Sequence, residues 1–152
     1  MKCLSVSQPF ANLIIQGKKT IELRRWNTSF RGEFLIHAPL TIRKDDCKRL
    51  KINSKNLVTG AIVGMAELYD VKKYKSSSEL RLDFKKHLAS KNFLSSRYSF
   101  LLKNAKPFRI PIPFKGKLGF FEVKLKKPKI KTNDLLEELI DEEYRYRWIG
   151  RH

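Results

Sequence analysis

The residues whose types and spacing could do chemistry lie in one short segment, Gly17–Trp26, which reads GKKTIELRRW. A single carboxylate stands there among lysines and arginines, with a tryptophan at the end. Side chains alternate along a strand with a period of two, so Thr20, Glu22 and Arg24 share one side of any strand formed here. The two aliphatic residues between them then face a core. The pattern therefore indicates a strand that holds polar side chains in fixed positions, as a binding or catalytic site requires.

Two of these residues could act on a ligand directly. Lys19 could contact a phosphate or, with a lowered pKa, act as a base or nucleophile; the alternative is an ordinary solvated lysine. Glu22 would repel phosphate, so we expect it to pair with Arg24 or Lys19, to accept a hydrogen bond from a base edge, or to act as a general base. A structural salt bridge that fixes Arg24 explains Glu22 equally well.

Polar and aromatic neighbours extend this candidate site. Arg24 and Arg31 suit bidentate contact with phosphate. Trp26 could stack on an unpaired base, and core or lid packing is its alternative. Ser7 and Gln8 could donate to a ligand from the start of a helix, although a helix cap would explain Ser7 equally well.

Metal, cofactor and serine-hydrolase chemistry find no support in the sequence. His37 lies in an apolar run, which favours a core histidine whose hydrogen bonds are satisfied within the protein. The three histidines and two cysteines lack the spacing of metal ligands. Neither a G-x-S-x-G motif nor a phosphate-binding glycine loop occurs. We therefore expect no metal and no cofactor.

The charge of the chain predicts a polyanionic partner. There are 33 Lys+Arg against 15 Asp+Glu, a formal net charge of +18. Nucleic acid is the usual partner of so basic a protein, although general lysine richness is an alternative explanation. Basic residues interleave with aromatic ones outside the site as well, which suits contact with a nucleic-acid backbone. These are Lys72, Lys73, Lys75, Lys103, Lys106, Lys115, Lys117 and the lysines of 124–131.

The sequence also predicts a location. No apolar run has the length of a signal peptide or a membrane span, and no strongly amphipathic basic helix suggests a membrane surface. Two cysteines are too few for a disulfide framework. We therefore expect a cytoplasmic protein that does not bind membranes.

Short strands and a few helices must position the candidate site. Apolar positions at i, i+3, i+4 and i+7 predict a helix from Ser7 to Gly17, with Ser7 as its cap and Gly17 as its left-handed end. Further helices are expected over 45–50, 78–93 and 134–143. Strands are expected over 2–6, 20–24, 33–38, 57–68, 98–102 and 118–125. The segment 108–113 is expected to be a proline-interrupted edge strand or an extended segment.

This pattern predicts an α+β fold, a small mixed β-barrel with peripheral helices. Residues 1–125 would form the domain. Residues 126–152 would form a basic linker and an acidic C-terminal helix that packs on the domain, extends from it, or binds a protein partner.

The order Gly17-x-Lys19-x-x-Glu22-x-Arg24 resembles the G-x-K-x-x-E-x-R signature of the ASCH (ASC-1 homology) family. Flanking segments fit as well: 4–10 before the signature, 26–38 after it, and 110–121 towards the end. The resemblance covers about residues 2–125.

The resemblance implies a PUA-like β-barrel with a cleft between the barrel and the first helix, occupied by RNA or a nucleotide-like ligand. Single-stranded RNA or DNA, or an unpaired base, is the expected partner. Some small relatives are hydrolases: amidohydrolases of N4-acetylcytidine, or ribonucleases. In the amidohydrolases a threonine follows the signature lysine by three residues, whereas Glu22 follows Lys19 here. We therefore rank binding first and a hydrolase, with Lys19 and Glu22 as its catalytic pair, second.

Overall fold

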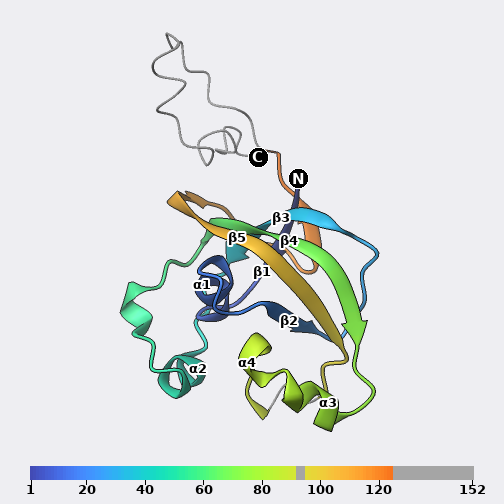
Figure 1. Cartoon of the computed structure of the whole chain (residues 1–152). Helices are drawn as coiled ribbons and strands as arrows, with labels where there is room; N and C mark the ends of the chain where they lie inside the picture. The colour runs from blue at the N-terminus through green and yellow to red at the C-terminus, as the bar shows by residue number, and fades with distance from the viewer. Residues whose placement is uncertain (92–94, 125–152) are drawn as a thin grey trace, which may run out of the picture.

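The computed structural model describes residues 1–91 and 95–124. A six-stranded mixed sheet, with strand order β2-β5-β4-β3-β1-β6, curls into a half-barrel (Figure 1). Its strands are β1 (Lys2–Ser5), β2 (Ile21–Arg24), β3 (Gly32–Ala38), β4 (Ala61–Lys73), β5 (Tyr98–Pro113) and β6 (Phe120–Glu122). The helices are α1 (Phe10–Ile15), α2 (Lys44–Arg49), α3 (Ser77–Leu82), α4 (Phe84–His87) and the short 3-10 helix η1 (Ser54–Asn56).

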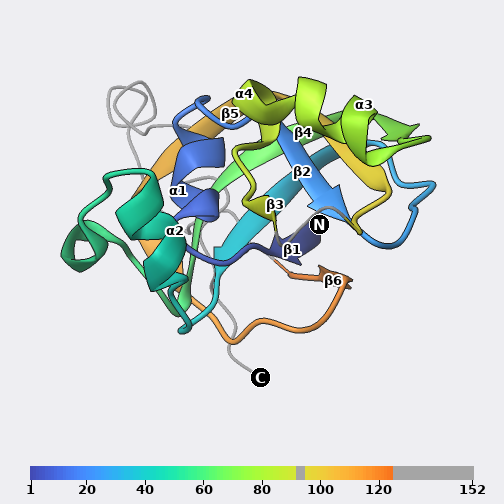
Figure 2. The same ribbon diagram turned by 90° about the horizontal axis from the view of Figure 1, so that it is seen from below.

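The long strands β4 and β5 give the sheet its curvature. They pair antiparallel from Ala61↔Pro113 to Lys73↔Tyr98, and the register shifts at three places along the pair. Such shifts bend a strand and increase its twist. β1 pairs parallel with β3, and β6 pairs antiparallel with β1 at the edge of the sheet. Figure 2 shows α3 and α4 on one side of the molecule and β6 on the opposite side.

Helix α1 fills the concave side of the sheet. Leu13 and Ile14 belong to one buried cluster with Phe34, Val63 and Phe100 from three strands. The helix ends where the sequence predicts, because Gly17 adopts the left-handed conformation with φ +76°. The expected cap is wrong: Pro9 occupies the N-cap position, and the side chain of Gln8, not that of Ser7, accepts from a first-turn N–H, that of Asn12.

Most expected elements are present, with two corrections. The segments 98–102 and 108–113 belong to a single strand, β5, because β4 pairs with it along its whole length. In the described part of the predicted helix over 78–93, two short helices replace it, and Ser76 rather than Ser78 accepts the capping hydrogen bond from the backbone N–H of Glu79. The fold class is confirmed. The expected linker and acidic helix of 126–152 lie outside the described residues.

Gly64 shows how closely α1 and the sheet approach each other. A Cβ on Gly64 would lie against the backbone oxygen of Lys106 and 2.7 Å from Cγ2 of Ile15. We expect Gly64→Ala to lower the free energy of unfolding by about 3 kcal/mol, measured by urea denaturation. Gly119→Ala is the control: open space surrounds its Cβ, so only the left-handed backbone costs about 1 kcal/mol. Equal losses in the two variants would contradict this account.

Among the described residues, no helix has the length and apolar character needed to cross a bilayer.

Candidate functional site

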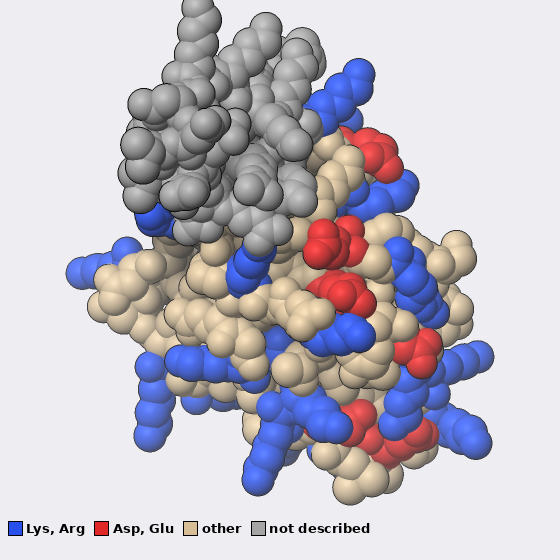
Figure 3. Space-filling model, turned by 45° about the horizontal axis from the view of Figure 1, so that its top comes forward, with Lys and Arg blue, Asp and Glu red and all other residues tan. Residues whose placement is uncertain are grey.

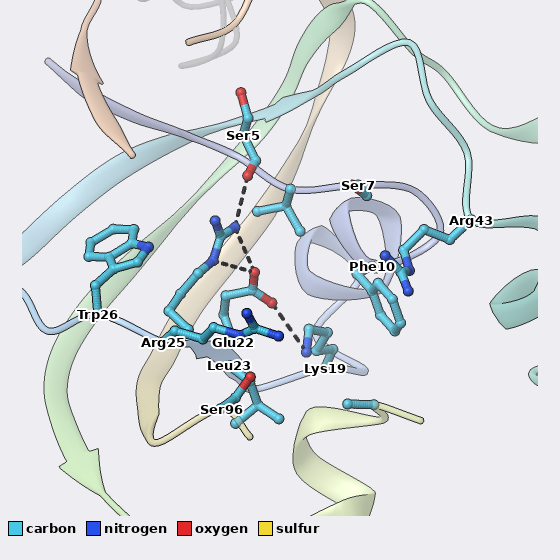
Figure 4. Close-up of a pocket in the computed structure, with 13 residues that line it drawn as sticks. Ser5, Ser7, Phe10, Lys19, Glu22, Leu23, Arg25, Trp26, Arg43 and Ser96 are labelled. Atoms are coloured by element: carbon cyan, nitrogen blue, oxygen red, sulfur yellow. Dashed lines mark hydrogen bonds and ion pairs between the residues drawn. The ribbon is translucent and has the colours of Figure 1, made fainter. Parts of the chain in front are cut away.

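A pocket of about 500 Å³ opens between α1, β2 and the chain after β1 (Figure 4). Three arginines, one buried lysine, one carboxylate and a tryptophan are among the side chains around it. Its lining comprises Ser5, Val6, Ser7, Phe10, Lys19, Glu22, Leu23, Arg24, Arg25, Trp26, Arg43, Ala89 and Ser96. The signature residues therefore meet at a hollow rather than on a flat or convex surface.

Lys19 is buried at the inner end of this pocket, with 3% of its surface exposed. The left-handed turn at Gly17 directs Lys18 into solvent and Lys19 inward. The ammonium group donates to the carbonyl oxygens of Ile21 and His87, each at 2.6 Å, and lies 3.4 Å from Oε1 of Glu22. An ammonium has three N–H bonds, and these three acceptors account for all of them. Lys19 thus joins β2 to the end of α4.

Glu22 holds Arg24 through two short contacts. Oε2 of Glu22 accepts from Nε of Arg24 at 2.9 Å and lies 2.7 Å from Nη2. The same Nη2 donates to the backbone oxygen of Ser5 at 2.8 Å, which connects β2 to β1. The guanidinium is therefore fixed, and the salt bridge expected as one explanation of Glu22 is present. No hydrogen bond occupies Nη1 within the described part of the chain.

Burial and charge act in opposite directions on this cluster. Burial lowers the pKa of Lys19, and the carboxylate of Glu22 offsets part of that lowering. Burial acts to raise the pKa of Glu22, but the charges of Arg24 and Lys19 outweigh it, and the pKa lies below its ordinary value of 4.5. Glu22 is consequently an anion at neutral pH, and three acceptors around Lys19 require an ammonium there.

Because the pKa of Glu22 is lowered in the folded protein, the free energy of unfolding should decrease at acid pH. Because the folded pKa lies below the unfolded one, the stabilisation is present above about pH 4.5 and is lost as pH falls through the folded value. Glu22→Gln should cost roughly 3–5 kcal/mol at pH 7 by leaving buried cations unpaired. Urea denaturation between pH 7 and 2.5 should show the wild type losing its advantage in acid.

The control for this experiment is Glu33→Gln. Glu33 is exposed and makes no ion pair within residues 1–91 and 95–124. Its substitution should leave the pH profile almost unchanged. A constant difference between wild type and Glu22→Gln across the whole range would show that the charge of Glu22 is not what stabilises the fold.

The outer part of the pocket carries exposed cations and one aromatic face. Arg25 is exposed and makes no ion pair with any described residue, whereas Nε of Arg43 donates to Asp46 at 2.8 Å. Trp26 is half-buried and packs edge-on against Phe100, with 5.3 Å between the two ring centroids. The core packing expected as the alternative to base stacking is therefore present. The guanidinium of Arg24 lies 6.0 Å from the indole ring, close enough for a cation–π contact.

The wider surface carries many cations. On the face shown in Figure 3, Lys and Arg side chains project around much of the margin, and Asp and Glu side chains lie among them on the right.

The structure brings together most of the predicted site residues. Ser7, Lys19, Glu22, Arg24 and Trp26 line the pocket. The other two predicted residues do not. The side-chain amide of Gln8 is buried, donates to the backbone oxygen of Val58 and accepts from the backbone N–H of Asn12. Nη2 of Arg31 lies 3.6 Å from Oδ1 of Asp70. Nη1 of Arg31 donates to the backbone oxygens of Thr28 and Phe30.

Sequence reasoning missed several lining residues. Ser5 contributes a backbone oxygen, and Arg43, Ala89 and Ser96 come from segments that only the fold brings here. Arg25 had a signal, since it adjoins the signature and is the second arginine of the Arg-Arg-Trp run. Alternation on a strand argued against it, but β2 ends at Arg24, so Arg25 is free to turn towards the hollow.

His37 is a buried histidine with both ring nitrogens engaged, as expected. Nε2 lies 2.7 Å from the backbone oxygen of Phe114, which must accept, so Nδ1 accepts from the hydroxyl of Ser5 at 3.0 Å. Burial lowers its pKa. Within the described ranges, no group of three or more His, Cys, Asp or Glu residues could hold a metal ion.

Comparison with known proteins decides the family. The ASCH domain model matches residues 4–112, which is most of the chain. The chain belongs to the ASCH family. It is 27% identical over 126 residues to activating signal cointegrator 1 of Homo sapiens and 26% identical to the same protein of Mus musculus. Each match covers 75% of this chain and 21% of the relative, so this ASCH chain spans about a fifth of the length of those curated relatives.

A solved structure supports the fold. The crystal structure of ASCH from Zymomonas mobilis matches with a TM-score of 0.59 and 18% identity, over 81% of this chain and 87% of that one. A sequence identity of 18% supports a shared fold and no shared ligand or activity. The ASCH half-barrel is thus shared, and the ligand of this chain must be argued from its own pocket.

Proposed function

We propose that this ASCH protein binds RNA by accepting one unpaired nucleotide in the pocket beside Glu22 and Arg24. The ASCH family is associated with RNA binding, and the net charge of +18 favours a polyanion. The cytoplasmic location expected from the sequence stays a prediction.

The observation that carries the proposal is the polarity of the pocket. Among the described residues, Glu22 is the only acidic side chain in the lining and lies at the inner end, whereas Arg25 is exposed. A phosphate would be repelled by Glu22 and attracted by the exposed cation. A base edge with an exocyclic amine could donate to Glu22 and accept from the unoccupied Nη1 of Arg24. The nucleotide would therefore enter with its base inward and its phosphate at the rim.

A hydrolase acting on a modified nucleoside or on RNA is the second candidate. The buried Lys19–Glu22 pair, 3.4 Å apart, is the observation that favours it. Binding ranks higher because the three N–H bonds of the Lys19 ammonium are all directed at acceptors of the protein itself, so Lys19 has no lone pair for attack and no N–H bond directed at a ligand. Incubation with N4-acetylcytidine and with single-stranded RNA, for the wild type and Glu22→Gln, separates the two functions. Turnover that depends on Glu22 would favour the hydrolase.

The binding test is fluorescence anisotropy with the full chain and short labelled oligomers. A single-stranded RNA and a duplex with one bulged nucleotide should bind more tightly than the fully paired duplex, because only the first two offer a base to the pocket. Affinity should fall steeply between about 50 and 200 mM salt. Matching DNA oligomers measure the preference for RNA. No binding at low salt, or equal binding of bulged and fully paired duplexes, would refute the proposal.

A further inference from the structure

A second hollow lies next to the pocket beside Glu22, between the end of α2 and the pair α3–α4. We call it the rear groove. It has a volume of about 840 Å³ and is lined by Arg49, Leu50, Leu80, Arg81, Phe84, His87, Ala89, Ser90 and Lys91. Leu80 is buried at 2% exposure, whereas Phe84 remains 44% exposed. Phe84 therefore adds apolar surface to the open side of the rear groove.

The polar groups of the rear groove are of one sign. Arg81 and Lys91 contribute positive charge, and no acidic residue is among the described residues of the lining. The charge of Arg49 is already paired with the buried carboxylate of Asp46, whose Oδ1 lies 2.9 Å from Nη2 of Arg49. The hydroxyl of Ser90 is buried and has no hydrogen-bond partner among the described residues. His87 is engaged, because its Nε2 donates to the backbone oxygen of Leu80 and its Nδ1 accepts from the N–H of Ala89. An occupant should therefore combine apolar side chains with negative charge.

The chain contains a segment with this composition. Residues 134–143 read DLLEELIDEE, with four aliphatic side chains and six of the 15 acidic residues of the protein. Leu135, Leu136, Leu139 and Ile140 recur at helical spacing, with the acidic residues between and after them. We propose that residues 134–143 are the occupant of the rear groove, with the aliphatic side chains over Leu80 and Phe84 and the carboxylates beside Arg81 and Lys91.

The position of the rear groove connects it to the nucleotide pocket. Ala89 lines both hollows. The backbone of α4 between them accepts from Lys19 at His87 and from the N–H of Thr20 at Lys86. A docked acidic segment would contact the side of α4 that faces away from Lys19. Its carboxylates would also reduce the positive electrostatic potential that attracts RNA. Docking and nucleic-acid binding should therefore oppose each other.

Photo-crosslinking in the full chain tests the docking without relying on RNA. Phe84 is replaced by p-benzoylphenylalanine, which keeps an aromatic ring in the rear groove, and crosslinked peptides are identified by mass spectrometry. We expect the dominant crosslinks to fall within residues 134–143. The control places the same group at Leu118, which is 99% exposed in the loop before β6. That loop lies on the opposite side of the molecule from α3 and α4 (Figure 2).

Charge reversal supplies the second arm. Arg81→Glu with Lys91→Glu should reduce the crosslink yield at least fivefold, and adding Glu137→Lys with Glu138→Lys should restore it. Crosslinks from position 84 to other parts of the chain or to another protein, or equal yields from positions 84 and 118, would overturn the proposal. If the full chain gives crosslinks within residues 134–143 but does not bind RNA, the proposed function is refuted and docking is not. If the full chain binds RNA but gives no crosslinks within residues 134–143, docking is refuted and the proposed function is not.

Discussion

Replacing Lys19 by methionine should lower the free energy of unfolding by roughly 3–5 kcal/mol, the cost of breaking a buried ion pair by removing one partner. Methionine keeps most of the side-chain volume and removes the charge. The backbone oxygens of Ile21 and His87 would then be buried without their donor, and Glu22 would lose one of its two cations. Urea denaturation at pH 7 measures the loss.

Lys18 is the matched control, because it is the same residue type one position earlier and is exposed. Lys18→Met should change the free energy of unfolding by less than about 0.5 kcal/mol. If both variants unfold alike while Lys19→Met abolishes an activity, Lys19 would be a catalytic group rather than the support that the structure shows. Hydrogen exchange at α4 should quicken in Lys19→Met, since the link between β2 and α4 is lost.

The local part of this site could be predicted from the sequence, because it depends on neighbours along the chain. Gly17 ends a helix, β2 follows, and alternation places Glu22 and Arg24 on one side. The burial of Lys19 could not be predicted in this way. Its second carbonyl partner, at His87, is 68 residues away and belongs to α4, which the sequence pattern had merged into one longer helix.

Gln8 and Arg31 illustrate the same limit. Each lies near the motif in sequence and has a side chain suited to a ligand, yet each is engaged elsewhere by a residue distant along the chain, Val58 or Asp70. Which polar side chain is already satisfied within the protein depends on tertiary contacts. Arg43 shows the converse, since it reaches the pocket from the N-cap position of α2 without any local signal.

The largest effect on nucleic-acid binding is expected from Arg25→Glu. Arg25 lines the pocket, is exposed and pairs with no acidic residue of the described chain, so its charge is available to a phosphate. Reversal should weaken RNA binding at about 100 mM salt by roughly tenfold or more and reduce the slope of log affinity against log salt by about one or two. Stability should stay within about 0.5 kcal/mol of the wild type, because Arg25 makes no hydrogen bond or ion pair with any described residue.

Lys117→Glu provides the matched reversal, because it changes the net charge by the same amount at an exposed residue outside the pocket lining. If the field of the whole protein governed binding, the two reversals would weaken it equally, and the pocket would have no special role. If the pocket seats a nucleotide, Arg25→Glu should have the larger effect, and the preference for a bulged over a fully paired duplex should shrink only in that variant. Nucleotide selectivity that survives Arg25→Glu would place the recognised base elsewhere on the protein.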